Sequence, residues 1–144
     1  MRVQLYEGSR SALLPLFRLA DESELHIRSY CEIGHILVAR KNDRVIGMIQ
    51  ISREKEHAEI VSLAVDPDNQ RQGIGTALIR EAANDCRRNS VRRLIVCTGS
   101  WEADNIAFYE RRGFRLFNVA RDFFTREKGY DLVVRDQAQL EKSL

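Results

Sequence analysis

The spacing of apolar residues changes along the chain and divides it into short strands and helices. Residues 3–7 (VQLYE) alternate between apolar and polar, which predicts a first strand. Residues 11–23 predict a helix, and Pro15 must then lie near its first turn, because an interior proline removes a backbone hydrogen bond. Residues 35–52 hold two β-rich runs around a Lys-Asn-Asp-Arg turn, which predicts a hairpin.

The clearest change of period comes in the middle of the chain. Residues 58–67 (AEIVSLAVDP) are almost wholly apolar from Ile60 to Val65, which predicts a strand in the centre of the sheet. From Ile74 onward apolar residues recur every four positions, which predicts a helix with one apolar stripe. That stripe consists of Ile74, Leu78, Ile79, Ala82, Ala83 and Cys86.

The last third of the chain predicts one more helix between strands. Residues 92–98 (RRLIVCT) predict a strand, and residues 104–112 predict a short helix that Gly113 closes. Residues 114–124 and 130–136 predict two closing strands. The order of elements, βαββ then βαβα then ββ, predicts a three-layer α/β/α fold with a mixed, mostly antiparallel sheet.

Composition limits the class of protein. The 144 residues suit a single domain over residues 1–144, and 44% apolar residues allow a real core. A net charge of +2 predicts no nucleic-acid partner, and the arginine pairs at 87–88 and 111–112 are interpreted as solvated faces. Residues 1–10 lack the apolar run of a signal peptide, and no stretch approaches ~18 apolar residues. We therefore expect a cytoplasmic protein without a membrane partner.

The cysteines and histidines give no sign of a disulfide framework or a metal centre. Three cysteines, at positions 31, 86 and 97, have no short paired spacing and are expected to be reduced, mostly buried thiols. The three histidines are far apart in the sequence, and no Cys-x-x-Cys occurs, so no metal site is expected.

Two glycines stand where the central strand turns into the helix, in the segment Gln70-Arg71-Gln72-Gly73-Ile74-Gly75-Thr76. A helix start offers unpaired N–H groups and a partial positive charge, and glycine lets the backbone approach an anion closely. The segment therefore suits a pyrophosphate cradle, to which Arg71 could add a cation. It lacks the lysine of a Walker loop, and Leu78 replaces the third glycine of a dinucleotide fingerprint. The alternative is a tight turn with no ligand.

The segment DNIAFYERRGF, residues 104–114, is the second candidate for a functional site. Asn105 and Tyr109 are four residues apart and share one face of the predicted helix. Taken alone, the segment could equally be a plain amphipathic helix with a half-buried tyrosine.

Together these two segments resemble the signature of the GCN5-related N-acetyltransferase (GNAT) superfamily. Its Arg/Gln-x-x-Gly-x-Gly/Ala loop after a strand corresponds to Gln70, Gly73 and Gly75, and its later Asn…Tyr helix ending in Gly-Phe corresponds to residues 105–114, although Ala107 stands two residues after the asparagine. The resemblance covers residues 45–114. It implies an acetyl-coenzyme A co-substrate.

The resemblance also implies roles for individual residues. Backbone groups of the central strand would bind the pantetheine arm and the thioester carbonyl, and the glycine loop would hold the pyrophosphate. Asn105 would hydrogen-bond the pantetheine arm, and Tyr109 would stand near the thioester sulfur. The implied coenzyme A contacts are Leu63, Ala64, Val65, Gln70, Arg71, Gln72, Gly73, Ile74, Gly75, Thr76, Asn105 and Phe108.

Acetyl transfer needs a neutral amine, and an alkylamine with a pKa near ~10.4 costs about 4–5 kcal/mol to neutralise at pH 7. Tyr109 is the candidate acid for the departing thiolate, and Glu59, acting through water, is the candidate base. Some relatives carry a glutamate twelve residues before the tyrosine, where this chain has Cys97. Cys97 is either a nucleophile or a buried structural thiol, and His57 is an alternative base.

We therefore predict an enzyme, an acetyl-CoA-dependent N-acetyltransferase that acts on a primary amine of a small molecule by direct attack on the thioester. The alternatives are a protein or peptide N-acetyltransferase and a non-catalytic acyl-CoA-binding regulatory module. The expected partner is a small-molecule amine acceptor, and a homodimer is a possible assembly.

Overall fold

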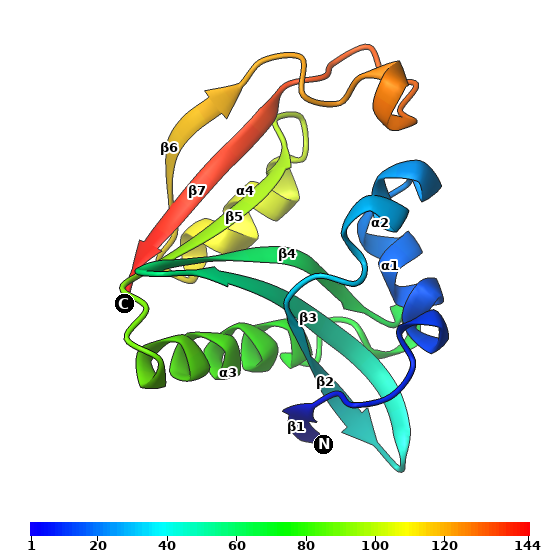
Figure 1. Ribbon diagram of the computed structural model, residues 1–144, viewed down its shortest axis with the longest axis vertical. Helices are drawn as coiled ribbons and strands as arrows, with labels where there is room; N and C mark the ends of the chain where they lie inside the picture. Colours follow the sequence, from blue (N-terminus) through cyan, green and yellow to red (C-terminus); the bar gives the residue numbers. More distant parts are fainter.

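Seven strands form one sheet in the order β1-β2-β3-β4-β5-β7-β6 in the computed structural model, which describes residues 1–144 (Figure 1). The strands are β1 (Arg2–Leu5), β2 (His35–Lys41), β3 (Arg44–Glu54), β4 (His57–Val65), β5 (Arg93–Gly99), β6 (Arg115–Ala120) and β7 (Gln137–Ser143). Neighbouring strands are antiparallel except for β4 and β5, which are parallel. The predicted fold class, a mixed and mostly antiparallel sheet in an α/β fold, is confirmed.

Helices cover both faces of the sheet and divide the core into two clusters. The helices are α1 (Leu14–Ala20), α2 (Glu24–Tyr30), α3 (Ile74–Arg88) and α4 (Ala103–Arg111), with short 3-10 turns η1 (Arg10–Leu13), η2 (Pro67–Asn69) and η3 (Arg126–Lys128). The larger cluster joins α3 and α4 to one face, through residues such as Leu78 and Tyr109. The smaller cluster joins α1 and α2 to the other face, through Phe17 and Ile27. None of the helices is long and apolar enough to cross a membrane.

Several local predictions are confirmed. Pro15 lies in the first turn of α1. Asn42 and Asp43 join β2 to β3 with φ of 53° and 64°, the left-handed conformation that tight hairpins require. The predicted stripe of α3 is buried along its whole length, and β4 is the middle strand of the seven.

The predicted helix over residues 11–23 is wrong in its extent. The chain forms η1 and α1, turns at Asp21, and begins a second helix, α2, that the sequence prediction did not include. Ser23 starts α2, because its hydroxyl accepts the backbone N–H of His26 at 3.0 Å. The turn at Asp21 lies beside the segment between β6 and β7, because Tyr130 and Lys128 of that segment hydrogen-bond to Asp21 and Ser23.

The predicted strand over residues 130–136 is also wrong. Those residues are irregular, and the last strand is β7, whose sequence QAQLEKS has a weaker β pattern. Val133 is fully exposed, whereas Leu140 is fully buried between β5 and β6. Insertion between two strands, rather than β-branched composition, decides which segment pairs. The predicted strand over residues 114–124 ends at Ala120.

Candidate active site

The parallel strands β4 and β5 separate partway along their length. Their registered pairs run only from His57 opposite Arg93 to Ile60 opposite Val96. A bulge interrupts the pairing of β4 with β3 next to Ile60. Figure 1 shows the two strands side by side at one end and diverging toward the other. The second half of β4 therefore has one edge paired with β3 and one edge unpaired within the sheet.

Two residues of β4 direct backbone groups toward that open edge. The N–H of Asp66 donates to Ile46 of β3 at 2.7 Å. Because backbone groups alternate in direction along a strand, Ala64 also points to β3, while Leu63 and Val65 point away from it. The carbonyl of Val65 accepts the side-chain amide of Gln70 at 3.0 Å on that side. Leu63 and Val65 are thus placed to meet a ligand lying between the strands, whereas the backbone of Ala64 is committed to β3.

The loop before α3 has the backbone conformation of an anion cradle. Arg71 and Gly73 both have left-handed φ, 63° and 79°, and residues 70–73 are exposed. The first hydrogen bond at the start of α3 runs from the N–H of Ala77 to the carbonyl of Gly73. The N–H groups of Ile74, Gly75 and Thr76 precede it and are available to an anion. Gln70 braces the loop against Val65, and the side chain of Gln72 is exposed.

Gly75 and Phe108 bring α3 against α4. A Cβ on Gly75 would lie 3.3 Å from Cζ of Phe108, so the two helices pack tightly at this glycine and a larger side chain would require the ring to shift. The guanidinium of Arg112 lies 3.6 Å from the centroid of the Phe108 ring. Its Nε and Nη2 donate to the Thr76 hydroxyl at 2.8 and 2.6 Å. Arg112 was expected to be part of a solvated face, and this is wrong, because it bridges the glycine loop and α4.

Asn105 lies at the start of α4 and is held by its neighbours. The carboxylate of Glu102 accepts the side-chain amide of Asn105 and, at 2.6 Å, the hydroxyl of Thr98. Because the Nδ2 of Asn105 donates to Glu102, its Oδ1 is left to accept a hydrogen bond from a ligand amide. Glu102 was not among the predicted site residues. Its place two residues before the predicted helix over residues 104–112 was the only sequence signal for it.

Tyr109 is 8% exposed and packs on Phe108 and Phe114, with ring centroids 5.3 and 5.6 Å apart. Burial, followed by the nearby charge of Glu102, raises the pKa of the Tyr109 phenol above its ordinary value of 10. The phenol is therefore protonated throughout the physiological pH range, as a proton donor must be.

Glu59 and Cys97 lie side by side on the face of the sheet that α1 and α2 cover. Glu59 is opposite Ser52, one alternation from Gln50, whose amide donates to the carbonyl of Tyr30 in α2. The Glu59 side chain is exposed to solvent, and desolvation by the groups around it raises the pKa of its carboxyl against the lowering effect of the Cys97 hydrogen bond. Burial and Glu59 raise the pKa of the Cys97 thiol to about 12, so it is a neutral thiol and a poor nucleophile at pH 7.

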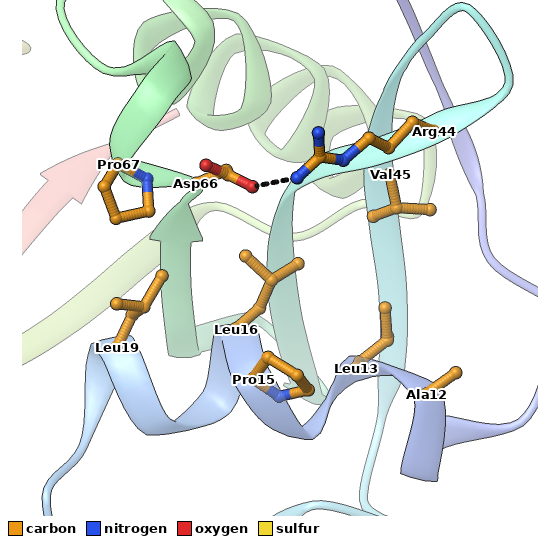
Figure 2. Close-up of a pocket in the computed structure, with 9 residues that line it drawn as sticks. All are labelled: Ala12, Leu13, Pro15, Leu16, Leu19, Arg44, Val45, Asp66 and Pro67. Carbon is orange, nitrogen blue, oxygen red and sulfur yellow. Dashed lines mark hydrogen bonds and ion pairs between the residues drawn. The ribbon is translucent and has the colours of Figure 1, made fainter.

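Two surface depressions lie near these elements. One, of about 380 Å³, is formed by residues 101–105 and contains Asn105. The other, of about 360 Å³, lies between α1 and the start of β3 and is shown in Figure 2, where Arg44 and Asp66 form an ion pair 3.0 Å long above Leu16. None of the predicted site residues lines this second depression.

Comparisons with known proteins agree on one family. A sequence model described as the Acetyltransferase (GNAT) family matches residues 4–114. The N-acetyltransferase YvbK of Bacillus subtilis is 27% identical over 133 residues, which cover 92% of this chain and 86% of that protein. The [ribosomal protein bS18]-alanine N-acetyltransferase of Escherichia coli K12 is 32% identical over 74 residues, which cover 51% of this chain and 50% of that protein.

Solved structures give the same result. The IAA acetyltransferase of Bacillus cereus superposes with a TM-score of 0.86 at 29% identity, covering 99% of this chain and 100% of that chain. A Bacillus subtilis acetyltransferase in complex with CoA superposes with a TM-score of 0.87 at 27% identity, covering 99% and 98%.

Proposed function

We propose that this member of the GNAT acetyltransferase family acetylates the primary amine of a small molecule. The chain belongs to that family and is an acetyl-CoA-dependent N-acetyltransferase. The proposal extends to the site residues, to their roles and to a single catalytic domain over residues 1–144. Acetyl-CoA supplies the acetyl group as an activated thioester. The observation that carries the coenzyme A site is the divergence of β4 and β5 beside the glycine loop.

The cofactor side of the site is assigned from backbone geometry. The loop from Gln70 to Thr76 holds the pyrophosphate with the free N–H groups of α3. The pantetheine arm lies along the open edge of β4, where Leu63 and Val65 offer backbone groups and Asn105 offers its Oδ1 from the opposite side. A backbone N–H of this edge donates to the thioester oxygen, where negative charge develops during attack.

Proton transfer is assigned to two side chains that lie on opposite faces of the sheet. Glu59, through water, takes a proton from the attacking nitrogen, and its raised pKa makes it a stronger base than an ordinary carboxylate. Tyr109 gives its proton to the departing thiolate. The high thiol pKa of Cys97 favours direct transfer from the thioester to the amine over an acyl-cysteine route.

A small acceptor is favoured by contacts on the acceptor side. The turn at Asp21 and the segment between β6 and β7 are joined by the hydroxyl of Tyr130, which donates to Asp21 at 2.6 Å, and by the hydroxyl of Ser23, which donates to the carbonyl of Lys128. These hydrogen bonds hold the turn at Asp21 against the β6–β7 segment, and the two segments would have to separate to admit a polypeptide. The relatives that acetylate ribosomal protein bS18 make a peptide acceptor the second candidate.

The experiment is an acceptor screen that follows free thiol released from acetyl-CoA. The panel is 2-phenylethylamine, spermidine and a peptide with an N-terminal alanine. We expect amine-dependent thiol release with a small amine. Release only with the peptide would replace the small-molecule proposal, and coenzyme A binding without release by any amine would indicate a regulatory binding module.

A further inference from the structure

A hydrogen-bonded cluster on the acceptor side takes no part in the roles assigned so far. Asp21, in the turn after α1, accepts the hydroxyl of Tyr130 at 2.6 Å and the hydroxyl of Tyr30 at 3.0 Å. It also accepts the backbone N–H of Ser23 at 3.0 Å. The Nδ1 of His26 lies 3.0 Å from Asp21 Oδ2 and 2.8 Å from the Tyr130 hydroxyl.

The donors and acceptors of this cluster fix the tautomer of His26. An ionised carboxylate only accepts hydrogen bonds, so Nδ1 must carry the hydrogen that faces Asp21. The proton of Tyr130 points to Asp21, so its oxygen also accepts from Nδ1. Burial raises the pKa of the phenols of Tyr30 and Tyr130, and both therefore stay protonated as donors. In the neutral imidazole, Nε2 is consequently the basic nitrogen.

The free nitrogen of His26 is accessible. Nε2 has no hydrogen-bond partner in the protein and is not among the buried polar side-chain atoms that lack one, so it reaches solvent. An aromatic cluster continues from the ring: His26 to Phe123, Phe123 to Phe124 and Phe124 to Trp101 have centroids 6.0, 5.0 and 5.2 Å apart. Trp101 is 39% exposed and lies over Gly99, at the end of β5 beside the divergence from β4.

We propose that the Asp21–His26 pair receives the acceptor, that Nε2 of His26 takes a proton from its ammonium group, and that the acceptor is an arylalkyl primary amine that packs on the His26-to-Trp101 aromatic cluster. This rests on the proposed function. One N–H bond of the ammonium breaks, its electron pair stays on nitrogen, and the proton forms a bond to Nε2. Asp21 balances the charge of the resulting imidazolium, and water later removes the proton. Glu59 then acts on the second proton, which leaves during attack.

Other charged groups around His26 affect this step. The negative charge of Glu22, in the turn after α1, contributes to the raised pKa of the Tyr130 phenol. Lys128, in η3, places its Nζ 3.6 Å from the centroid of the Phe123 ring. The positive charge of this lysine lowers the pKa of an ammonium group bound nearby and so eases the transfer of its proton to Nε2.

The test compares wild type with His26→Asn. The asparagine amide can replace Nδ1 as a donor to Asp21 but provides no basic nitrogen. With acetyl-CoA and 2-phenylethylamine we expect kcat/KM for the amine to fall about 100-fold at pH 7, within the usual range for proton transfer. The loss should shrink at about pH 9.5, where more of the amine is already neutral, while coenzyme A affinity is unchanged.

The matched control is His35→Asn. His35 also pairs with an aspartate, Asp85 of α3, at 2.9 Å and with similar exposure, but on the other face of the sheet. We expect it to keep wild-type kcat/KM. A loss in His26→Asn that is equal at both pH values, or no loss, overturns the proposal.

Nitrogen NMR of wild type keeps the test independent of how the variant folds. We expect His26 to be protonated on Nδ1, and its Nε2 signal to shift when 2-phenylethylamine is added to the coenzyme A complex. An Nε2–H tautomer, or an unmoved signal, overturns the proposal. Acetylation of spermidine without acetylation of 2-phenylethylamine overturns it too, but leaves the proposed function intact.

Discussion

At the scale of single residues, desolvation prepares two groups for opposite tasks. Burial raises the pKa of the Tyr109 phenol, and partial desolvation raises the pKa of the Glu59 carboxyl, whose side chain is exposed. For the phenol this preserves the proton that it is proposed to donate. For the carboxyl it increases basicity and moves titration above the ordinary value of 4.5.

Tyr109→Phe keeps the ring packing and removes only the hydroxyl. We expect kcat to fall by about 10²–10⁴-fold, the usual range for a general acid, while coenzyme A affinity barely changes. Steady-state rates and a calorimetric titration check this. A kcat within twofold of wild type would make Tyr109 a packing residue, and a parallel loss of affinity would make it a binding residue.

Glu59→Gln tests the base through pH dependence. The raised pKa means that the basic form of Glu59 appears only as pH rises through a value above 4.5, so kcat/KM of wild type should fall on the acid side at a pH above that of an ordinary carboxylate. We expect the glutamine variant to be slower at neutral pH and to lose the part of the acid limb that the titration of Glu59 contributes. An unchanged profile would transfer the role to water or to another group.

At the scale of secondary-structure elements, the junction of α3 with α4 supports the glycine loop. Arg112 joins the Thr76 hydroxyl to the last turn of α4, where its Nη1 donates to the carbonyl of Phe108 at 2.7 Å. Gly75 allows the ring of Phe108 to approach α3. The position of the N–H groups proposed to bind the pyrophosphate therefore depends on contacts between two helices.

Arg112→Met should loosen this junction while keeping a long apolar side chain. We expect coenzyme A affinity to fall about tenfold, which corresponds to about 1.4 kcal/mol. Arg111→Met, at the exposed neighbouring position, is the control and should bind like wild type. Equal affinities for the two variants would show that the Thr76 contact does not position the loop.

Gly75 variants test how closely the pyrophosphate of coenzyme A must approach the backbone at this position. Gly75→Ala places a methyl group 3.3 Å from Phe108, which the ring can accommodate by a small shift. Gly75→Glu also brings a negative charge next to the proposed pyrophosphate. We expect a modest loss of coenzyme A affinity in the first variant and a severe loss in the second, with the fold retained by circular dichroism. Unchanged affinity in Gly75→Glu would favour a turn that binds no ligand.

At the scale of the whole molecule, the proposed site belongs to no single layer. The co-substrate would lie between strands from the two halves of the sheet, against α3 and α4, and the acceptor would approach beside α1, α2 and the segment between β6 and β7. A ligand that contacts all of these parts binds only the folded chain.

Acetyl-CoA should therefore raise the melting temperature. At a concentration of 100 times Kd the stabilisation is about 2.7 kcal/mol, which corresponds to several degrees for a domain of this size. Differential scanning fluorimetry checks this, with NAD and ATP at equal concentration as controls. Equal shifts from all three would leave the pantetheine contacts without support.

The glycine turn before α3 could be predicted because its conformational requirements are local. Gly73 needs a left-handed φ, and a helix start supplies N–H groups, so a short segment contains both requirements. The buried stripe of α3 and the β2–β3 turn follow from equally local periodicity and turn chemistry. The direction in which the backbone groups of β4 point could not be predicted from local sequence. The bulge beside Ile60 and the pairing with β3 determine which of these groups face the open edge.

The α/β class, the central strand, the glycine turn before α3 and the helix face shared by Asn105 and Tyr109 could be predicted, because each depends on residues a few positions apart. Only the tertiary structure decided that β7 is residues 137–143, that Arg112 binds Thr76, and that Asp21, His26 and Tyr130 meet. The contact of Arg112 with Thr76 joins residues 36 positions apart, the contact of Tyr130 with Asp21 joins residues 109 positions apart, and no local spacing encodes either. They arise because long-range pairing and packing determine which side chains become neighbours.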